Sequence, residues 1–124
     1  PVQIEGAGLY IDDPHFAQDD GEVSLTALEA SLRATLRVQV VPTAEAKRLF
    51  GRTDPPFAIS HGTLIPMGFS STLDDALSQS VEHAINMITA MFEMPRQQVY
   101  LLLSADIDFN VTQVVDITPK AFTV

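Results

Sequence analysis

The sequence of 124 residues contains no cysteine. This absence excludes disulfide bonds, catalysis by a thiolate and a zinc site built on cysteine ligands. The sequence also lacks any apolar run close to the roughly 18 residues that a membrane-spanning helix needs. Its first residues, Pro1 to Glu5, lack the basic and apolar regions of a signal peptide. We therefore expect a soluble, cytoplasmic protein, in which a metal site would use Asp, Glu and the three histidines.

Basic residues are few, with 7 Lys and Arg against 16 Asp and Glu, so the formal net charge is −9. A field of this sign repels phosphate backbones and anionic lipids. We therefore expect neither nucleic acid nor a membrane as a partner. At 46% hydrophobic residues the chain can bury a core, and its length is that of one domain.

Alternation of apolar and polar residues predicts several strands. The clearest is residues 32–40, where every second residue is apolar, which is typical of a strand with one buried face. Shorter patterns predict strands over 7–11, 23–27, 57–60, 63–66 and 107–115, the last closed by Pro119. Residues 43–56 mix charges, Gly51 and prolines, which predicts a connection with at most one helical turn.

The period changes after Thr72. Apolar residues then recur at three- and four-residue steps from Leu73 to Phe92, which predicts an amphipathic helix of about five turns. Thr72 and Asp75, three residues apart, form a variant of the capping box at its start.

Pro95 suits the first turn of a second, shorter helix, whose apolar face would be Val99, Leu102 and Leu103. The order of these elements predicts an α+β fold. We expect a β-rich domain with mixed or antiparallel strands, one long amphipathic helix, a short second helix and a closing strand.

The densest polar cluster runs from Asp12 to Glu22, between two predicted strands. Loops in such places commonly carry function on a rigid scaffold. Crowded carboxylates repel one another, and protonation or a bound cation relieves the repulsion. Asp, Glu and His are ligands that suit Zn, Mn, Mg or Ca. Two interpretations stay open on composition alone: a metal-binding or catalytic loop, and a solvated acidic turn without a function.

This loop resembles the D-x-H-x-x-Q-G-D-G-E signature of the acetamidase/formamidase family, through Asp13, His15, Gln18 and residues 20–22. The resemblance extends to residues 6–11 and 26–29 beside the loop. Residues 67–69 with the 73–92 helix, and residues 100–116, are similar to the family's late helix and closing strand. Asp12 and Asp19 depart from the pattern, because the family usually has glycine at both positions. Asp tolerates the left-handed backbone region better than most residues, so we expect the loop to keep its shape.

The resemblance implies hydrolysis of short linear amides, such as formamide and acetamide, to the acid and ammonia, or of γ-lactams. Family members are longer chains, so the resemblance implies that residues 1–124 form the C-terminal part of such a hydrolase. We expect the N-terminal half as a partner, either as a separate chain or as a missing segment, and a homo-oligomeric assembly.

Roles follow for the residues that match the signature. With no cysteine available, water activated by a divalent metal is the expected nucleophile. We expect Asp13 and His15 to bind the metal, zinc or calcium, and Glu22 to act as the general base. Asp20 would be a further ligand or an orienting group, and Gln18 would bind the substrate amide.

Two other functions compete with the amidase. One is a non-catalytic assembly or binding domain related to the amidases, which the departures at Asp12 and Asp19 allow. The other is a tautomerase that uses the amine of Pro1 as a base, although the β-α-β repeat of such proteins is absent. Two histidines have simpler expected roles: His61 would be satisfied by a backbone partner, and His83 would be solvated on the polar side of the helix.

Overall fold

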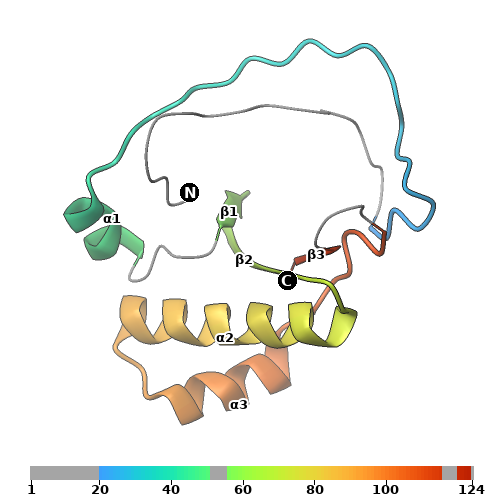
Figure 1. Cartoon of the computed structure of the whole chain (residues 1–124). Helices are drawn as coiled ribbons and strands as arrows, with labels where there is room; N and C mark the ends of the chain where they lie inside the picture. The colour runs from blue at the N-terminus through green and yellow to red at the C-terminus, as the bar shows by residue number, and fades with distance from the viewer. Residues whose placement is uncertain (1–19, 51–55, 116–119, 124) are drawn as a thin grey trace.

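A computed structural model describes residues 20–50, 56–115 and 120–123 of the chain. The elements follow in the order α1 (Thr43–Phe50), β1 (Phe57–Ser60), β2 (Thr63–Ser70), α2 (Leu73–Phe92), α3 (Arg96–Asp106) and β3 (Lys120–Thr123). The strands form one antiparallel sheet in the order β1-β2-β3. Helix α2 lies against this sheet, and α3 covers the opposite side of α2 (Figure 1). This arrangement confirms the predicted α+β class.

Strands β1 and β2 form a tight hairpin, in which Ser60 pairs with Thr63. The two residues between them, His61 and Gly62, have φ angles of 49° and 85°. Positive φ at both central residues is the requirement of the type I′ turn, whose twist matches that of the flanking strands. The two short strands predicted here are confirmed, and β2 continues to Ser70.

Helix α2 has the predicted bounds. Thr72 stands before it in an extended conformation, and its hydroxyl oxygen accepts a hydrogen bond from the Asp75 N–H at 3.2 Å. The Thr72 hydroxyl in turn donates to the Asp75 carboxylate at 2.7 Å. The cap therefore satisfies one of the N–H groups that the first turn of any helix leaves without a partner. The helix ends at Phe92, and Glu93 follows it in the left-handed conformation.

One cluster of the core lies between α2 and α3. Ala84 and Ile85 of α2 are buried against Val99 and Leu103 of α3. Leu102, which was predicted on the same apolar face, is instead 40% exposed. The residues packed around this cluster are Val81, Ile88, Met94 and Phe109.

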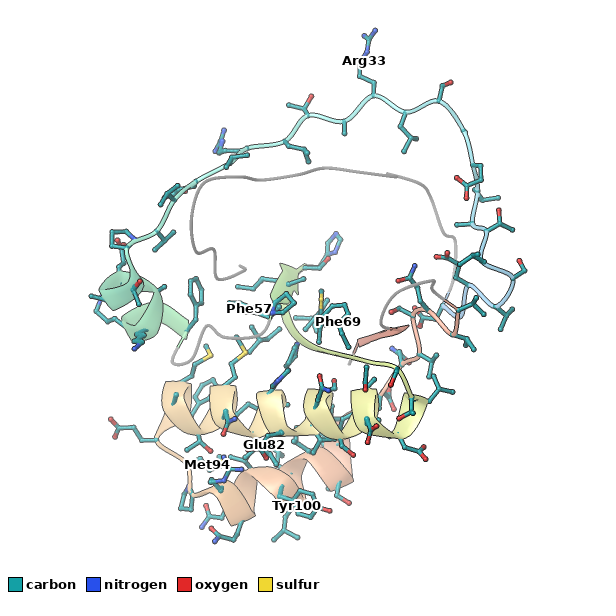
Figure 2. The ribbon with its side chains drawn as sticks, in the orientation of Figure 1. Arg33, Phe57, Phe69, Glu82, Met94 and Tyr100 are labelled. Atoms are coloured by element: carbon teal, nitrogen blue, oxygen red, sulfur yellow. The ribbon has the colours of Figure 1, made fainter. Side chains whose placement is uncertain are left out.

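A polar contact joins the same two helices at their surface. The Arg96 guanidinium donates to both carboxylate oxygens of Glu82, at 2.8 and 2.9 Å, and to the side-chain oxygen of Asn86. Glu82 lies between α2 and α3, whereas Tyr100 lies on the outer side of α3 (Figure 2). The fork geometry of Arg suits a carboxylate held in this way.

Helix α2 and strand β2 approach each other closely at Gly68. A Cβ atom at this position would overlap the Ala76 carbonyl and lie 2.7 Å from the Ser80 nitrogen. Ala76 and Ser80 are fully buried under the strand. The glycine therefore sets the distance between the sheet and the helix.

His83 was predicted to be solvated, and this prediction is wrong. Its Nδ1 atom lies 2.6 Å from the carbonyl oxygen of Met67 in β2, and the ring is half-buried. A carbonyl oxygen only accepts, so Nδ1 carries the hydrogen and donates it. His61 also differs from its prediction, because its Nδ1 lies 3.0 Å from the Ser60 hydroxyl rather than on a backbone group.

Residues 32–41, which we call the extended segment, do not form the strand predicted over 32–40. They pair with no described residue and run as a long arch away from the sheet, with Arg33 near its top (Figures 1 and 2). Leu36, Val38 and Val40 are 60%, 64% and 88% exposed. A strand needs a neighbour for its backbone hydrogen bonds, and no described part of the chain supplies one.

Three further local predictions are corrected. Residues 43–50 form α1, an eight-residue helix rather than a single turn, and Phe50 packs edge-on against Phe57 at 5.1 Å between ring centroids. Residues 23–27 and 107–115 form no strand, and the closing strand β3 follows Pro119 instead of preceding it. The strand predicted over 7–11 lies outside the described residues.

No helix in the part of the chain that the structure describes has the length and apolar character to cross a membrane.

We predict that Gly68→Ala lowers the free energy of unfolding by about 1–3 kcal/mol, the usual cost of overpacking a core. The added methyl meets helix backbone, which cannot move without shifting the whole of α2. Urea unfolding followed by circular dichroism measures this change. An unchanged midpoint would show that the helix and the sheet are not in close contact at this position.

Candidate functional site

The structure describes part of the predicted site. Asp20 and Glu22 lie within the described residues, and Asp13, His15 and Gln18 lie outside them, as does Pro1. Of the acidic cluster, the structure thus describes residues 20–22. Asp20 is exposed and Glu22 is half-buried.

The loop is attached to the C-terminal part of the chain by a short parallel pairing. Gly21 pairs with Gln113. The Gly21 N–H donates to the Thr112 carbonyl at 2.9 Å, and the Val114 N–H donates to the Gly21 carbonyl at 2.9 Å. Both backbone groups of Gly21 are thus satisfied by the segment after α3, which brings two distant parts of the sequence together.

The side chains beside this pairing also meet. The Gln113 side-chain N–H donates to one carboxylate oxygen of Glu22 at 2.7 Å, in a half-buried position. An ionised carboxylate is an acceptor only, so the amide nitrogen of Gln113, and not its oxygen, faces Glu22. Glu22, one of the two predicted site residues that the structure describes, is thus held in a specific, half-buried contact.

The backbone of the loop is unusual at the same point. Gly21 has a φ of 116° and Glu22 a φ of 31°, both positive. Residues held in such conformations persist where the surrounding structure fixes them, and they are enriched at active sites and ligand-binding loops. The two hydrogen bonds of Gly21 supply that restraint here.

Gln113 is a site residue that the sequence did not predict as one. It falls in the region similar to the family's closing strand, but nothing in its spacing connects it to Glu22, which lies 91 positions earlier. The pattern around it predicted a regular strand, in which its partner could not be identified. Only the parallel pairing with Gly21 shows the relation.

The described residues do not by themselves form a metal site. Among them, no three His, Asp or Glu side chains come together in a way that could hold an ion. Asp20 and Glu22 provide carboxylate oxygens, the donor type that zinc and calcium accept. The expected metal ligands, Asp13 and His15, lie outside the described residues, so a metal at this site stays a prediction.

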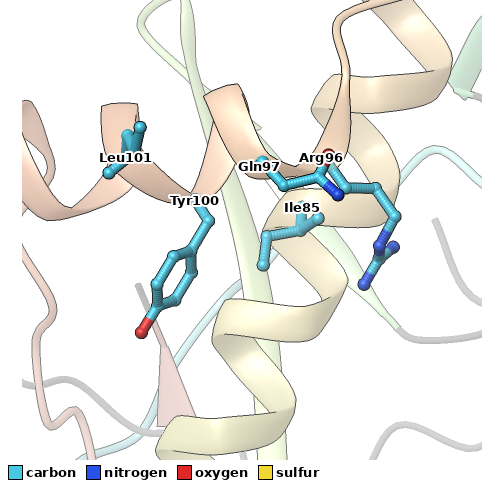
Figure 3. Close-up of a pocket in the computed structure, with 5 residues that line it drawn as sticks. All are labelled: Ile85, Arg96, Gln97, Tyr100 and Leu101. Atoms are coloured by element: carbon cyan, nitrogen blue, oxygen red, sulfur yellow. The ribbon is translucent and has the colours of Figure 1, made fainter.

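A hollow on the other side of the molecule is a poor alternative site. It measures about 430 Å³ and lies where α3 crosses α2, lined by Ile85, Arg96, Gln97, Tyr100 and Leu101 (Figure 3). Its described lining contains no carboxylate and no imidazole, and Arg96 is already bonded to Glu82. The hollow offers apolar contact but no base or metal ligand for hydrolysis.

Comparison with protein families gives a match over the whole chain. The sequence profile of the acetamidase/formamidase family matches residues 1–124. The chain belongs to the acetamidase/formamidase family. Neither a curated protein nor a solved structure matches it.

Membership of the acetamidase/formamidase family indicates amide hydrolysis as the class of reaction. It also bears on the two interpretations of the acidic cluster, a metal-binding or catalytic loop and a solvated turn without a function. The chain belongs to a family associated with hydrolysis, and Glu22 makes a half-buried contact with Gln113. Both observations favour a functional loop over a solvated turn.

We predict that Gly21→Ala lowers the free energy of unfolding by about 1–3 kcal/mol, the usual cost of a residue in a sparsely populated backbone region. The added methyl meets no atom within 4 Å, so the cost comes from the positive φ alone. Hydrogen exchange at the Val114 amide should become faster, because this amide donates to Gly21.

The matched control for this variant is Gly62→Ala, which also has a positive φ and open space around the new methyl. It should lose comparable stability at the hairpin turn. Hydrogen exchange at the Val114 amide should then become faster only by as much as the lower global stability requires. Equal local protection of Val114 in both variants would contradict the restraint assigned to Gly21.

Proposed function

We propose that this chain carries part of the active site of an amidase, which hydrolyses the C–N bond of a small amide. The substrate would be formamide, acetamide or a γ-lactam, and the attacking group would be water activated by a divalent metal. The observation that carries the proposal is the half-buried Glu22 carboxylate, held by Gln113 in a loop that matches the family. It supports a base in a fixed position rather than a mobile surface acid.

In the proposed reaction, Glu22 takes a proton from the attacking water as its oxygen bonds to the carbonyl carbon. The same carboxyl group then delivers the proton to the leaving nitrogen, and the C–N bond breaks to give the acid and ammonia or an amine. A base in this role must be anionic and within hydrogen-bond reach of the water. Asp20, the residue before Gly21, would orient the water or add a ligand.

The remaining roles fall on residues that precede the described part of the loop. Asp13 and His15 would hold the metal, zinc or calcium, and Gln18 would bind the substrate amide. When bound, the metal polarises the amide carbonyl and lowers the pKa of its water. These roles rest on the match of the three residues to the family pattern.

We predict that Glu22→Gln lowers kcat for ammonia release from acetamide or formamide by about 10²–10⁴-fold, the usual contribution of a general base. Treatment with a chelator should abolish the activity, and zinc or calcium should restore it. The matched control is Glu45→Gln. Glu45 is exposed in the first turn of α1, and its loss should leave kcat within about twofold.

Full activity of Glu22→Gln would exclude Glu22 as the base. Activity that survives the chelator would exclude the metal. The absence of any amide hydrolysis in the unaltered protein, assembled with its partner, would favour the non-catalytic alternative.

We further propose that the extended segment binds another polypeptide, the N-terminal part of the same enzyme. Leu36, Val38 and Val40 expose an apolar row, whereas Arg33 and Arg37 lie in the alternating polar row. Contiguous exposed apolar surface commonly marks a protein interface, and an extended segment with no neighbour among the described residues can serve as a template for pairing with another chain. The absence of acidic residues between 30 and 41 suits a partner strand that carries carboxylates.

We predict that Leu36→Asp weakens this association, because a charge on the apolar row would be buried in the interface. Thr35→Asp is the matched control, since it adds the same charge to the polar row beside two arginines. Sedimentation of the purified protein measures the association. A wild-type chain that sediments as a single free copy and hydrolyses amides would contradict the proposal that a partner binds the extended segment.

A further inference from the structure

A carboxylate base needs a fixed direction as well as a fixed place. Glu22 has a flexible side chain, and its backbone stands at a positive φ at the edge of a loop. Displacement of a catalytic group by about 1 Å can cost about 10²-fold in rate. The contacts that restrain the Glu22 carboxylate therefore bear on catalysis if Glu22 is the base.

Gln113 restrains this carboxylate from a well-anchored position. Its backbone stands directly opposite Gly21, in a pairing closed by hydrogen bonds from Gly21 to Thr112 and from Val114 to Gly21. The Gln113 side chain then spans to the next residue of the loop and donates to Glu22 at 2.7 Å. Backbone and side chain of one segment thus hold two consecutive residues of the loop.

The side-chain amide of Gln113 is suited to holding the Glu22 carboxylate in place. A neutral amide donates a directional hydrogen bond to one carboxylate oxygen without adding a positive charge to the site. A lysine or arginine at this position would form a salt bridge, which competes with proton transfer from water. A leucine would match the size of the side chain and remove the donor.

We infer that Gln113 is a positioning residue for the Glu22 carboxylate in amide hydrolysis. The inference rests on the proposed function, because it needs Glu22 to be the base. Gln113 contacts neither the substrate nor the water in this scheme and acts through Glu22.

Kinetics of the enzyme with its partner test this inference, with Gln113→Leu as the main variant. We expect kcat for acetamide or formamide to fall about 10–100-fold with KM changed by less than about twofold, since orientation and not binding is lost. Gln98→Leu is the matched control, because Gln98 is exposed on α3. It should behave as the unaltered enzyme.

The decisive measurement repeats Gln113→Leu in the Glu22→Gln background. A residue that acts through Glu22 has nothing left to position there, so the second substitution should lower the residual rate by less than about twofold. A residue with a general structural role would lower the rate by the same factor in both backgrounds. That result would overturn the inference.

If Gln113→Leu does not fold, Gln113→Asn serves as the test variant. It retains the amide and shortens its reach by one methylene, so kcat should again fall while the melting temperature changes little. Normal kcat in Gln113→Asn and Gln113→Leu, together with an inactive Glu22→Gln, would leave the amidase proposal intact and refute the role of Gln113. Absence of hydrolysis in the unaltered enzyme would refute both.

Discussion

The candidate site depends on one short backbone pairing between distant parts of the chain. Gly21 joins residues 112–114 through two hydrogen bonds of 2.9 Å. Each such bond contributes about 0.5–1.5 kcal/mol in net terms, and the residues that the pairing holds include Gly21 and Glu22, both at positive φ. This pairing helps to fix the position of the Glu22 carboxylate, so residues 112–114 belong to the candidate site although none of them is acidic.

The extended segment begins ten residues after Glu22 in the sequence, with Leu32. The loop is thus held on one side by residues 112–114 and continues on the other into a stretch with exposed apolar side chains. A partner that pairs with the extended segment would restrain the loop from this second side. The proposed association and the proposed catalysis are then physically connected, because the same stretch of backbone leads from one to the other.

The features that the sequence predicted well are those that local interactions determine. Helix α2 has its predicted bounds because a 20-residue amphipathic pattern and the Thr72 cap act within one stretch of chain. Strands depend on partners, which the pattern over 32–40 does not reveal. The same limit applied to His83 and Gln113, whose partners lie 16 and 91 positions away. Family membership was readable from the acidic cluster because its spacing is specific, whereas the residue that holds Glu22 belongs to a region of weaker pattern.

The hydrogen bond between His83 and Met67 fixes the tautomer of the imidazole. Since Nδ1 donates its hydrogen to the Met67 carbonyl, the neutral ring presents Nε2 as its acceptor. The imidazole therefore links α2 to β2 in one fixed ring orientation, and a side chain without a donor at this position would leave the Met67 carbonyl without this partner.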